Sequence, residues 1–102
     1  PTCAAAWHTL ALAKTNCGRD DSVNDFSEAL LLTPKNPKLW NDRGVAKMSL
    51  GDYSGAIADY SEAVHLCPDN TTFYNNRGIA RIRISDFTGA IDEWSEVLRM
   101  DP

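Results

Sequence analysis

The chain has 102 residues, of which 43% are hydrophobic and 24% charged, and its formal net charge is −4 at pH 7. This composition is typical of an ordinary folded domain, and the acidic balance argues against a protein that binds nucleic acid or anionic membranes. The longest uncharged, apolar-leaning stretch, Cys3 to Ala13, is shorter than the roughly 20 residues that a membrane-spanning helix needs.

The three cysteines, Cys3, Cys17 and Cys67, cannot all pair within one chain, and no two have the CxxC spacing of a metal or redox motif. We therefore expect reduced thiols, which favours a reducing intracellular compartment, and no metal or cofactor. The sequence has no initiator Met and no signal peptide. Because it opens on Pro1 and stops on Asp101 and Pro102, we expect it to be a fragment of a longer protein.

An internal repeat of 34 residues runs through the chain, and 102 is three times 34. Residues 37–68 align with residues 71–102, and eleven of the 32 pairs are identical. The identical pairs are Asn41/Asn75, Arg43/Arg77, Gly44/Gly78, Ala46/Ala80, Asp52/Asp86, Gly55/Gly89, Ala56/Ala90, Ile57/Ile91, Ser61/Ser95, Glu62/Glu96 and Pro68/Pro102. We therefore expect a single domain over residues 1–102, with copies at approximately 3–36, 37–70 and 71–102.

The first copy is the least regular of the three. The segment from Trp7 to Gly18 is as long as the segment from Trp40 to Gly51 and aligns with it. Between Gly18 and Asp25, however, the offset between the first and second copies changes by one residue. We expect this change of register to lie in a turn, where insertions and deletions are tolerated best.

The second copy predicts two helices. Asn36 suits an N-cap, Pro37 suits the first helical position, and Gly51 suits the end of that helix. Asp52 then caps a second helix over residues 53–66.

The third copy predicts the same pair, with its last helix running from Phe87 to Met100. Large apolar residues return at helical spacing, and no segment alternates with the period of two that a half-buried strand requires. The predicted fold class is therefore all-α.

The repeat resembles the tetratricopeptide repeat (TPR), a 34-residue helix–turn–helix unit. The resemblance rests on Trp40, Gly44, Gly51, Asp52, Tyr53, Ala56, Ile57, Tyr60, Ala63 and Pro68. One period later it rests on Tyr74, Gly78, Asp86, Phe87, Ala90, Ile91, Trp94 and Pro102, while Ser85 and Val97 depart from the pattern. It implies an α-solenoid of three units with six helices, stacked as a right-handed superhelix. It also implies a non-enzymatic scaffold for protein–protein interaction, whose concave groove is lined by the first helix of each unit and holds a peptide or helix of a partner.

The resemblance assigns the groove-lining positions one by one. They are His8, Leu12 and Thr15 in the first unit, Lys38, Asn41, Val45 and Met48 in the second, and Thr72, Asn75, Ile79 and Ile82 in the third. Since an amide both donates and accepts hydrogen bonds, Asn41 and Asn75 suit the backbone of an extended peptide. The apolar positions suit an amphipathic helix, unless they pack between the helices instead.

Some TPR proteins bind the acidic C-terminal tails of chaperones through a clamp of basic and amide side chains. The corresponding positions here are His8, Leu12, Asp42, Thr72 and Asn76. None matches the clamp, and Asp42 would repel a carboxylate. The sequence therefore disfavours chaperone tails as partners.

Charged residues recur with the repeat. Arg43 and Arg77 either offer donors to an acidic ligand or pack between units and pair with nearby acids. Acids gather on the second helices, at Asp25, Glu28, Asp59, Glu62, Asp92, Glu93 and Glu96. We expect these acids to lie on a solvated convex face, and no catalytic constellation is indicated.

The last helix is expected to expose part of its apolar face, including Ile91, Trp94, Val97 and Leu98. Solenoids need polar ends, so another molecule or more chain should cover this face. The sequence thus leaves three functions open: binding a partner in the groove, self-association through the repeat ends, and docking for a larger multidomain protein.

Overall fold

The structure is a computed structural model, and it describes residues 22–100 as five helices. The helices are α2 (Ser22–Leu32), α3 (Pro37–Ser49), α4 (Tyr53–Leu66), α5 (Thr71–Arg83) and α6 (Phe87–Met100). Residues 22–100 contain no strand, so the prediction of an all-α chain is confirmed over this range. Six helices were predicted, and the first of them in the chain falls within residues 1–21, outside the described residues.

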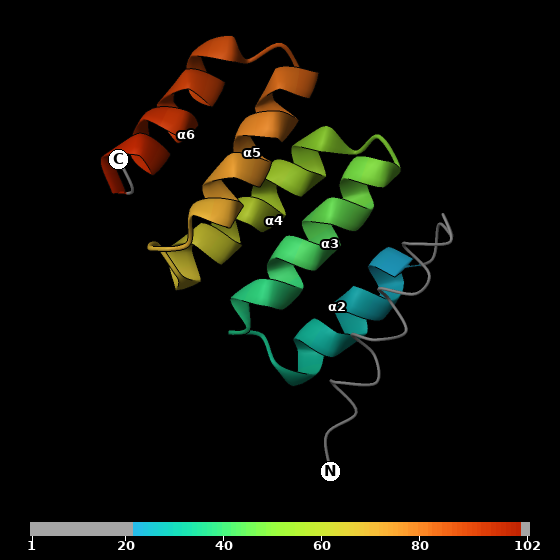
Figure 1. Ribbon diagram of the computed structural model, residues 1–102. Helices are drawn as coiled ribbons and strands as arrows, with labels where there is room; N and C mark the ends of the chain where they lie inside the picture. Colours follow the sequence, from blue (N-terminus) through green and yellow to red (C-terminus); the bar gives the residue numbers. More distant parts are fainter. Residues whose placement is uncertain (1–21, 101–102) are drawn as a thin grey trace.

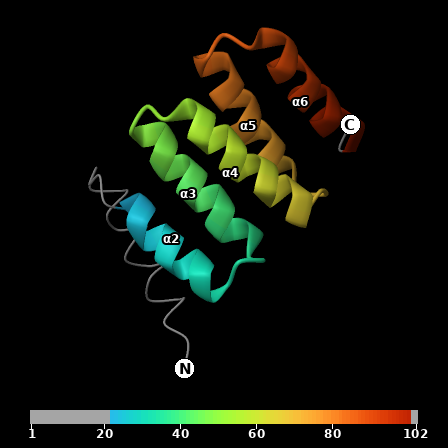
Figure 2. The same cartoon turned by 180° about the vertical axis from the view of Figure 1, so that it is seen from behind.

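The helices follow one another in space as they do in sequence. Each of α2 to α5 packs against the next helix, and α3 also touches α5 directly. Figure 1 shows this progression from α2 in blue to α6 in red, and Figure 2 shows it from behind. Because α5 and α6 begin 34 residues after α3 and α4 and match them in length, the structure repeats the 34-residue period of the sequence.

The predicted N-caps are confirmed. Asn36 accepts a hydrogen bond from the backbone N–H of Lys38, and Asp52 accepts one from Gly55. Asn70 caps α5 in the way that Asn36 caps α3. Each cap satisfies a backbone donor that the first turn of a helix leaves without an intrahelical partner.

The turns that join the paired helices also repeat. After α3, Gly51 has a φ of 82°, and the backbone N–H of Asp52 donates to the carbonyl of Lys47 over 2.9 Å. After α5, Ser85 has a φ of 63°, and the N–H of Asp86 donates to the carbonyl of Arg81 over 2.8 Å. Both turns are Schellman motifs, in which a left-handed residue ends the helix.

Paired helices approach closely where glycine faces an aromatic ring. A β-carbon built on Gly44 would lie 2.6 Å from the Tyr60 ring, and one built on Gly78 would lie 3.2 Å from the Trp94 ring. Apolar contacts fill the space between successive units: Phe26 and Leu30 of α2 pack with Leu39 of α3. A second cluster of Ala56, Tyr60 and Ala80 joins α4 to α5.

Candidate partner-binding surface

The surface predicted from the resemblance is carried by α3 and α5, which touch each other. Lys38, Thr72 and Asn75 are exposed, and Asn41 is half-buried. His8, Leu12 and Thr15 lie outside the described residues. We call the part that the structure describes the α3/α5 surface: Lys38, Asn41, Val45, Met48, Thr72, Asn75, Ile79 and Ile82.

Three aliphatic side chains of the α3/α5 surface are exposed to solvent. Val45, Ile79 and Ile82 have exposed fractions of 38%, 37% and 43%. Met48 differs, since it is half-buried and packs against the cluster of Ala56, Tyr60 and Ala80. The alternative that these residues pack between helices therefore describes Met48 but not the other three. An exposed apolar row on neighbouring helices is the kind of surface that an apolar partner segment can cover.

The two asparagines of this surface are already engaged within the chain. The Asn76 side-chain amide donates to Oδ1 of Asn41 over 2.8 Å, which joins α5 to α3. The Trp94 indole N–H donates to Oδ1 of Asn75 over 2.8 Å. Both Oδ1 atoms are thus used internally, so a partner would meet mainly the amide N–H donors of Asn41 and Asn75.

Arg43 joins three helices. Its Nε and Nη2 donate to the two carboxylate oxygens of Asp59 on α4, over 2.9 and 2.8 Å. Its Nη1 donates to the hydroxyl of Ser27 on α2 over 3.0 Å. The guanidinium also lies 4.9 Å from the ring centre of Trp40. Arg43 therefore pairs with an acid of its own unit and reaches into the preceding one.

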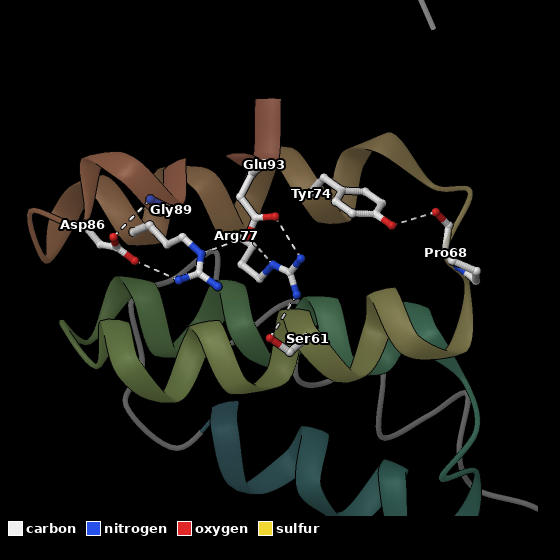
Figure 3. A network of polar contacts seen from close by, with 8 residues as sticks. Ser61, Pro68, Tyr74, Arg77, Asp86, Gly89 and Glu93 are labelled. Carbon is white, nitrogen blue, oxygen red and sulfur yellow. Dashed lines mark hydrogen bonds and ion pairs between the residues drawn. The ribbon is translucent and has the colours of Figure 1, made fainter. Parts of the chain in front are cut away.

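Arg77 repeats this arrangement one period later (Figure 3). Its Nη2 donates to Glu93 of α6 over 2.8 Å, its Nε contacts the same carboxylate, and its Nη1 donates to Ser61 of α4 over 3.2 Å. Its guanidinium lies 5.6 Å from the ring centre of Tyr74. Of the two interpretations offered by the sequence for these arginines, the structure confirms the second: each pairs with a nearby acid, which lies in its own unit, and also contacts a serine of the preceding unit.

The expectation that all the acids lie on a solvated face is wrong for three of them. Asp25, Asp59 and Glu93 are buried, with exposed fractions of 6%, 2% and 4%. Asp59 and Glu93 are the carboxylates that receive the two arginines, and Lys47 also approaches Asp59 to 3.2 Å. Asp59 and Glu93 stand one period apart, and each joins the two helices of its own unit, whereas Glu28, Glu62 and Asp92 are exposed as expected.

Sequence reasoning did not assign a role to Ser27, Ser61 or Asn76. The serines contact the arginine of the next unit, and Asn76 bridges α5 and α3. A signal was present for the serines, because Ser61 and Ser95 are an identical pair in the internal alignment and Ser27 lies one period earlier.

The pKa values of two side chains, Tyr60 and Asp86, are shifted by their surroundings. Burial, followed by the charges of Asp59 and Asp42, raises the pKa of the Tyr60 phenol well above its usual range. A hydrogen bond from the Gly89 backbone and a second from Arg81 lower the pKa of Asp86. Tyr60 therefore stays neutral, and Asp86 stays charged into mildly acidic solution.

The predicted exposed end of the chain is only partly as expected. Ile91 and Leu98 are exposed, at 64% and 65%. Trp94 is half-buried, because its ring lies against Gly78 and its indole N–H bonds to Asn75. Val97 is half-buried as well. The apolar surface at this end is therefore narrower than the sequence suggested.

None of the five helices has the length and apolar character needed to span a bilayer. Over residues 22–100, His, Cys, Asp and Glu side chains form no group of three or more that could hold a metal ion.

Paired helices that recur every 34 residues, each packed on the next, define a helical repeat protein of the kind that serves as an interaction scaffold. A family model described as TPR repeat matches residues 46–85. Solved structures similar to the chain include TPR domains. The resemblance to the TPR family is thereby confirmed.

Three of these structures show the extent of the likeness. The first TPR of Spaghetti (RPAP3), bound to the HSP90 peptide SRMEEVD, is 25% identical with a TM-score of 0.90, over 97% of this chain and 79% of that one. The second TPR of the same protein, with the same peptide, is 18% identical with a TM-score of 0.88, over 96% and 92%. The Sgt2 TPR domain from Aspergillus fumigatus is 19% identical with a TM-score of 0.89, over 96% and 66%.

No curated protein matches the sequence significantly. Two of these structures hold an HSP90 peptide, which is the kind of partner that the sequence of this chain disfavours. Among the clamp positions that the structure describes, Asp42 is buried, Thr72 is exposed and Asn76 bonds to Asn41.

Proposed function

We propose that this chain is a protein–protein interaction module that holds a partner peptide or amphipathic helix along the α3/α5 surface. The observation that carries the proposal is the exposed row of Val45, Ile79 and Ile82 on two helices that touch each other. Complete burial of a fully exposed aliphatic side chain is worth about 1.5–3 kcal/mol, so covering the exposed two fifths of each of these side chains is worth roughly 0.6–1.2 kcal/mol. In this proposal the chain has no catalytic activity of its own.

The proposal includes the finer architecture expected from the family. Three units over approximately 3–36, 37–70 and 71–102 would form a six-helix, right-handed solenoid. His8 and Leu12 of the first unit would then extend the α3/α5 surface at one end. The internal repetition of the Arg43 and Arg77 arrangement supports a regular stacking of units.

The chemistry of the α3/α5 surface favours a partner segment with apolar side chains and free backbone carbonyls. Its aliphatic row is apolar, and its asparagines offer N–H donors because their oxygens are engaged. Lys38 adds one exposed positive charge at the start of α3. The HSP90 tail peptide SRMEEVD, held by two neighbours, belongs among the first probes.

A selection from a displayed peptide library, with SRMEEVD as an added probe, tests this proposal. Peptides that bind the chain should bind the Val45→Asp and Ile79→Asp variants at least about tenfold more weakly, since each change places a charge in the apolar contact. Leu31→Asp is the matched control, because Leu31 is 76% exposed on α2 and lies outside the surface. Peptides whose affinity is equal for all variants would place the binding site elsewhere.

Self-association through the repeat end, at Ile91, Trp94 and Leu98, is the second candidate function. It is favoured by the exposure of Ile91 and Leu98, although Trp94 is largely engaged with Gly78 and Asn75. Sedimentation velocity over a hundredfold range of concentration decides between the two. A mass that rises with concentration supports self-association, and a constant monomer mass leaves partner binding.

A further inference from the structure

The second helix of each unit carries a serine at the same position: Ser27 on α2, Ser61 on α4 and Ser95 on α6. Ser27 accepts a hydrogen bond from Arg43 of the following unit, and Ser61 accepts one from Arg77. Ser95 is exposed and bonds to no side chain within residues 22–100. Ser95 thus presents to solvent the hydroxyl that, in Ser27 and Ser61, accepts a hydrogen bond from an arginine.

The apolar residues around these serines follow the same pattern. Ile57 of α4 is half-buried and packs against the cluster that contains Ala80 of α5, and Val64 is also half-buried. Their counterparts on α6 are Ile91 and Leu98, which are 64% and 65% exposed. Among the described helices α6 contacts α5 alone. The surface that receives α5 on α4 is therefore repeated on α6, where none of the described helices packs on it. We call it the α6 outer face, formed by Ile91, Ser95 and Leu98.

The chain itself shows what kind of helix covers such a surface. Both α3 and α5 carry an aromatic residue followed three residues later by an arginine, as Trp40 and Arg43 or as Tyr74 and Arg77. Residues three apart lie on the same face of a helix, so the ring supports the guanidinium that reaches the serine.

An exposed acid lies near Ser95, while the Arg99 side chain, four residues after Ser95, is paired with Glu96. Asp92 is exposed and lies three residues before Ser95, on the same side of α6. The corresponding position on α4 is the neutral Ala58. An arginine approaching Ser95 would therefore meet a negative charge that the interface between α4 and α5 lacks at this position.

A second copy of the chain does not supply a suitable helix from its described part. The side chains of Arg43 and Arg77 are only 18% and 16% exposed and are already paired with Asp59 and Glu93. In the first unit, the sequence has Leu10 at the position equivalent to Arg43. An arginine that follows an aromatic residue at this spacing and is free to reach Ser95 must therefore come from outside residues 22–100 of the chain.

We propose that the α6 outer face is a second docking surface, separate from the α3/α5 surface, for an amphipathic helix of a partner protein. That helix carries an aromatic residue and, three residues later, an arginine that donates to Ser95. Its apolar side chains cover Ile91 and Leu98, as α5 covers the equivalent part of α4.

The probe that tests this is a helix-stabilised, fluorescein-labelled peptide with the sequence of α5, residues 71–83. It is titrated with the whole 102-residue chain and followed by fluorescence anisotropy. The matched peptide carries alanine in place of the arginine equivalent to Arg77. The protein variants are Leu98→Glu, Ser95→Ala and, as a control on the other surface, Val45→Asp, each checked for unchanged helicity by circular dichroism.

We expect saturable binding that Leu98→Glu weakens at least about tenfold, since a carboxylate then faces the apolar side of the peptide. Ser95→Ala and the arginine-to-alanine peptide should each weaken binding severalfold, and the two changes combined should cost little more than either one. Val45→Asp should leave the affinity unchanged. Absence of binding, binding insensitive to Leu98→Glu, or a dimer of the chain that excludes the peptide would overturn the proposal.

Discussion

Ser85 takes the same left-handed backbone conformation after α5 that Gly51 takes after α3, with φ of 63° and 82°. Each stands between two hydrogen bonds that close its helix, to Ile82 and Arg81 in one turn and to Met48 and Lys47 in the other. The geometry of the turn is therefore kept although the residue is not. A side chain in this conformation is strained, whereas glycine adopts it without a steric penalty.

We expect Ser85→Gly to stabilise the chain by about 0.5–1 kcal/mol and Gly51→Ser to destabilise it by about 1 kcal/mol. No atom lies within 4 Å of a β-carbon built on Gly51, so the second effect would be purely conformational. Urea unfolding of both variants, followed by circular dichroism, measures the two changes. Equal effects of the same sign would contradict this explanation.

The Arg43 arrangement predicts a large loss of stability when the arginine is removed. Arg43→Leu leaves the carboxylate of Asp59 buried, with only the Lys47 ammonium at 3.2 Å to compensate it. We expect destabilisation by about 2–3 kcal/mol, because removing one partner of a buried pair strands the other. Replacing Asp59 with leucine as well should recover part of the loss. Denaturant unfolding of the two single variants and the double variant gives the coupling energy, and a value near zero would mean that Lys47 alone neutralises Asp59.

The two glycines that face aromatic rings predict different responses to alanine. At Gly44 the new methyl would lie 2.6 Å from the buried Tyr60 ring, so we expect a loss of about 1–3 kcal/mol from overpacking. At Gly78 the distance to Trp94 is 3.2 Å and that ring is only half-buried, so the gain in helix propensity of about 1 kcal/mol largely offsets the clash. Thermal unfolding of Gly44→Ala and Gly78→Ala compares them directly. A larger loss at Gly78 would show that the indole cannot move.

Asp86 predicts a dependence of stability on pH. Because the Gly89 N–H and Arg81 lower its pKa in the folded state, its charged form stabilises the fold above the unfolded pKa of about 3.9, and this contribution is lost as pH falls through the folded value. Asp86→Asn keeps a capping oxygen but removes the charge. The difference in free energy of unfolding between wild type and Asp86→Asn should therefore be greatest near pH 7 and shrink below about pH 4.

The control for this experiment is the Arg81→Gln background, which removes one of the two groups that lower the pKa of Asp86. There the effect of Asp86→Asn should be smaller at pH 7. A difference that stays constant from pH 7 to pH 3 would show that the charge of Asp86 does not contribute to stability.

Some features of the α3/α5 surface could be predicted from the sequence and others could not. Val45, Ile79 and Ile82 were assigned to the surface by the resemblance to the TPR, and all three are exposed. The engagement of Asn75 by Trp94 could not be predicted, because those residues lie 19 positions apart on different helices. The Asn75 side chain is thus bonded to Trp94 of the same chain, a contact that the period of the sequence does not reveal.

The sequence by itself determined the elements of this protein. The period of 34, the caps at Asn36 and Asp52 and the turn at Gly51 are local features, and each acts through residues close to it in the chain. From these features the sequence predicted the bounds of α4 and α6 correctly. It also predicted the start of α3, which ends two residues before Gly51.

Only the tertiary structure decided what the charges do. Asp59 and Glu93 look like surface acids in sequence, yet packing of the units removes them from water and leaves arginine as the group that compensates their charge. The packing also decided that Ser27 and Ser61 would be bonded, while Ser95 remains exposed. Burial depends on which helix comes next in space, and an individual repeat does not contain that information.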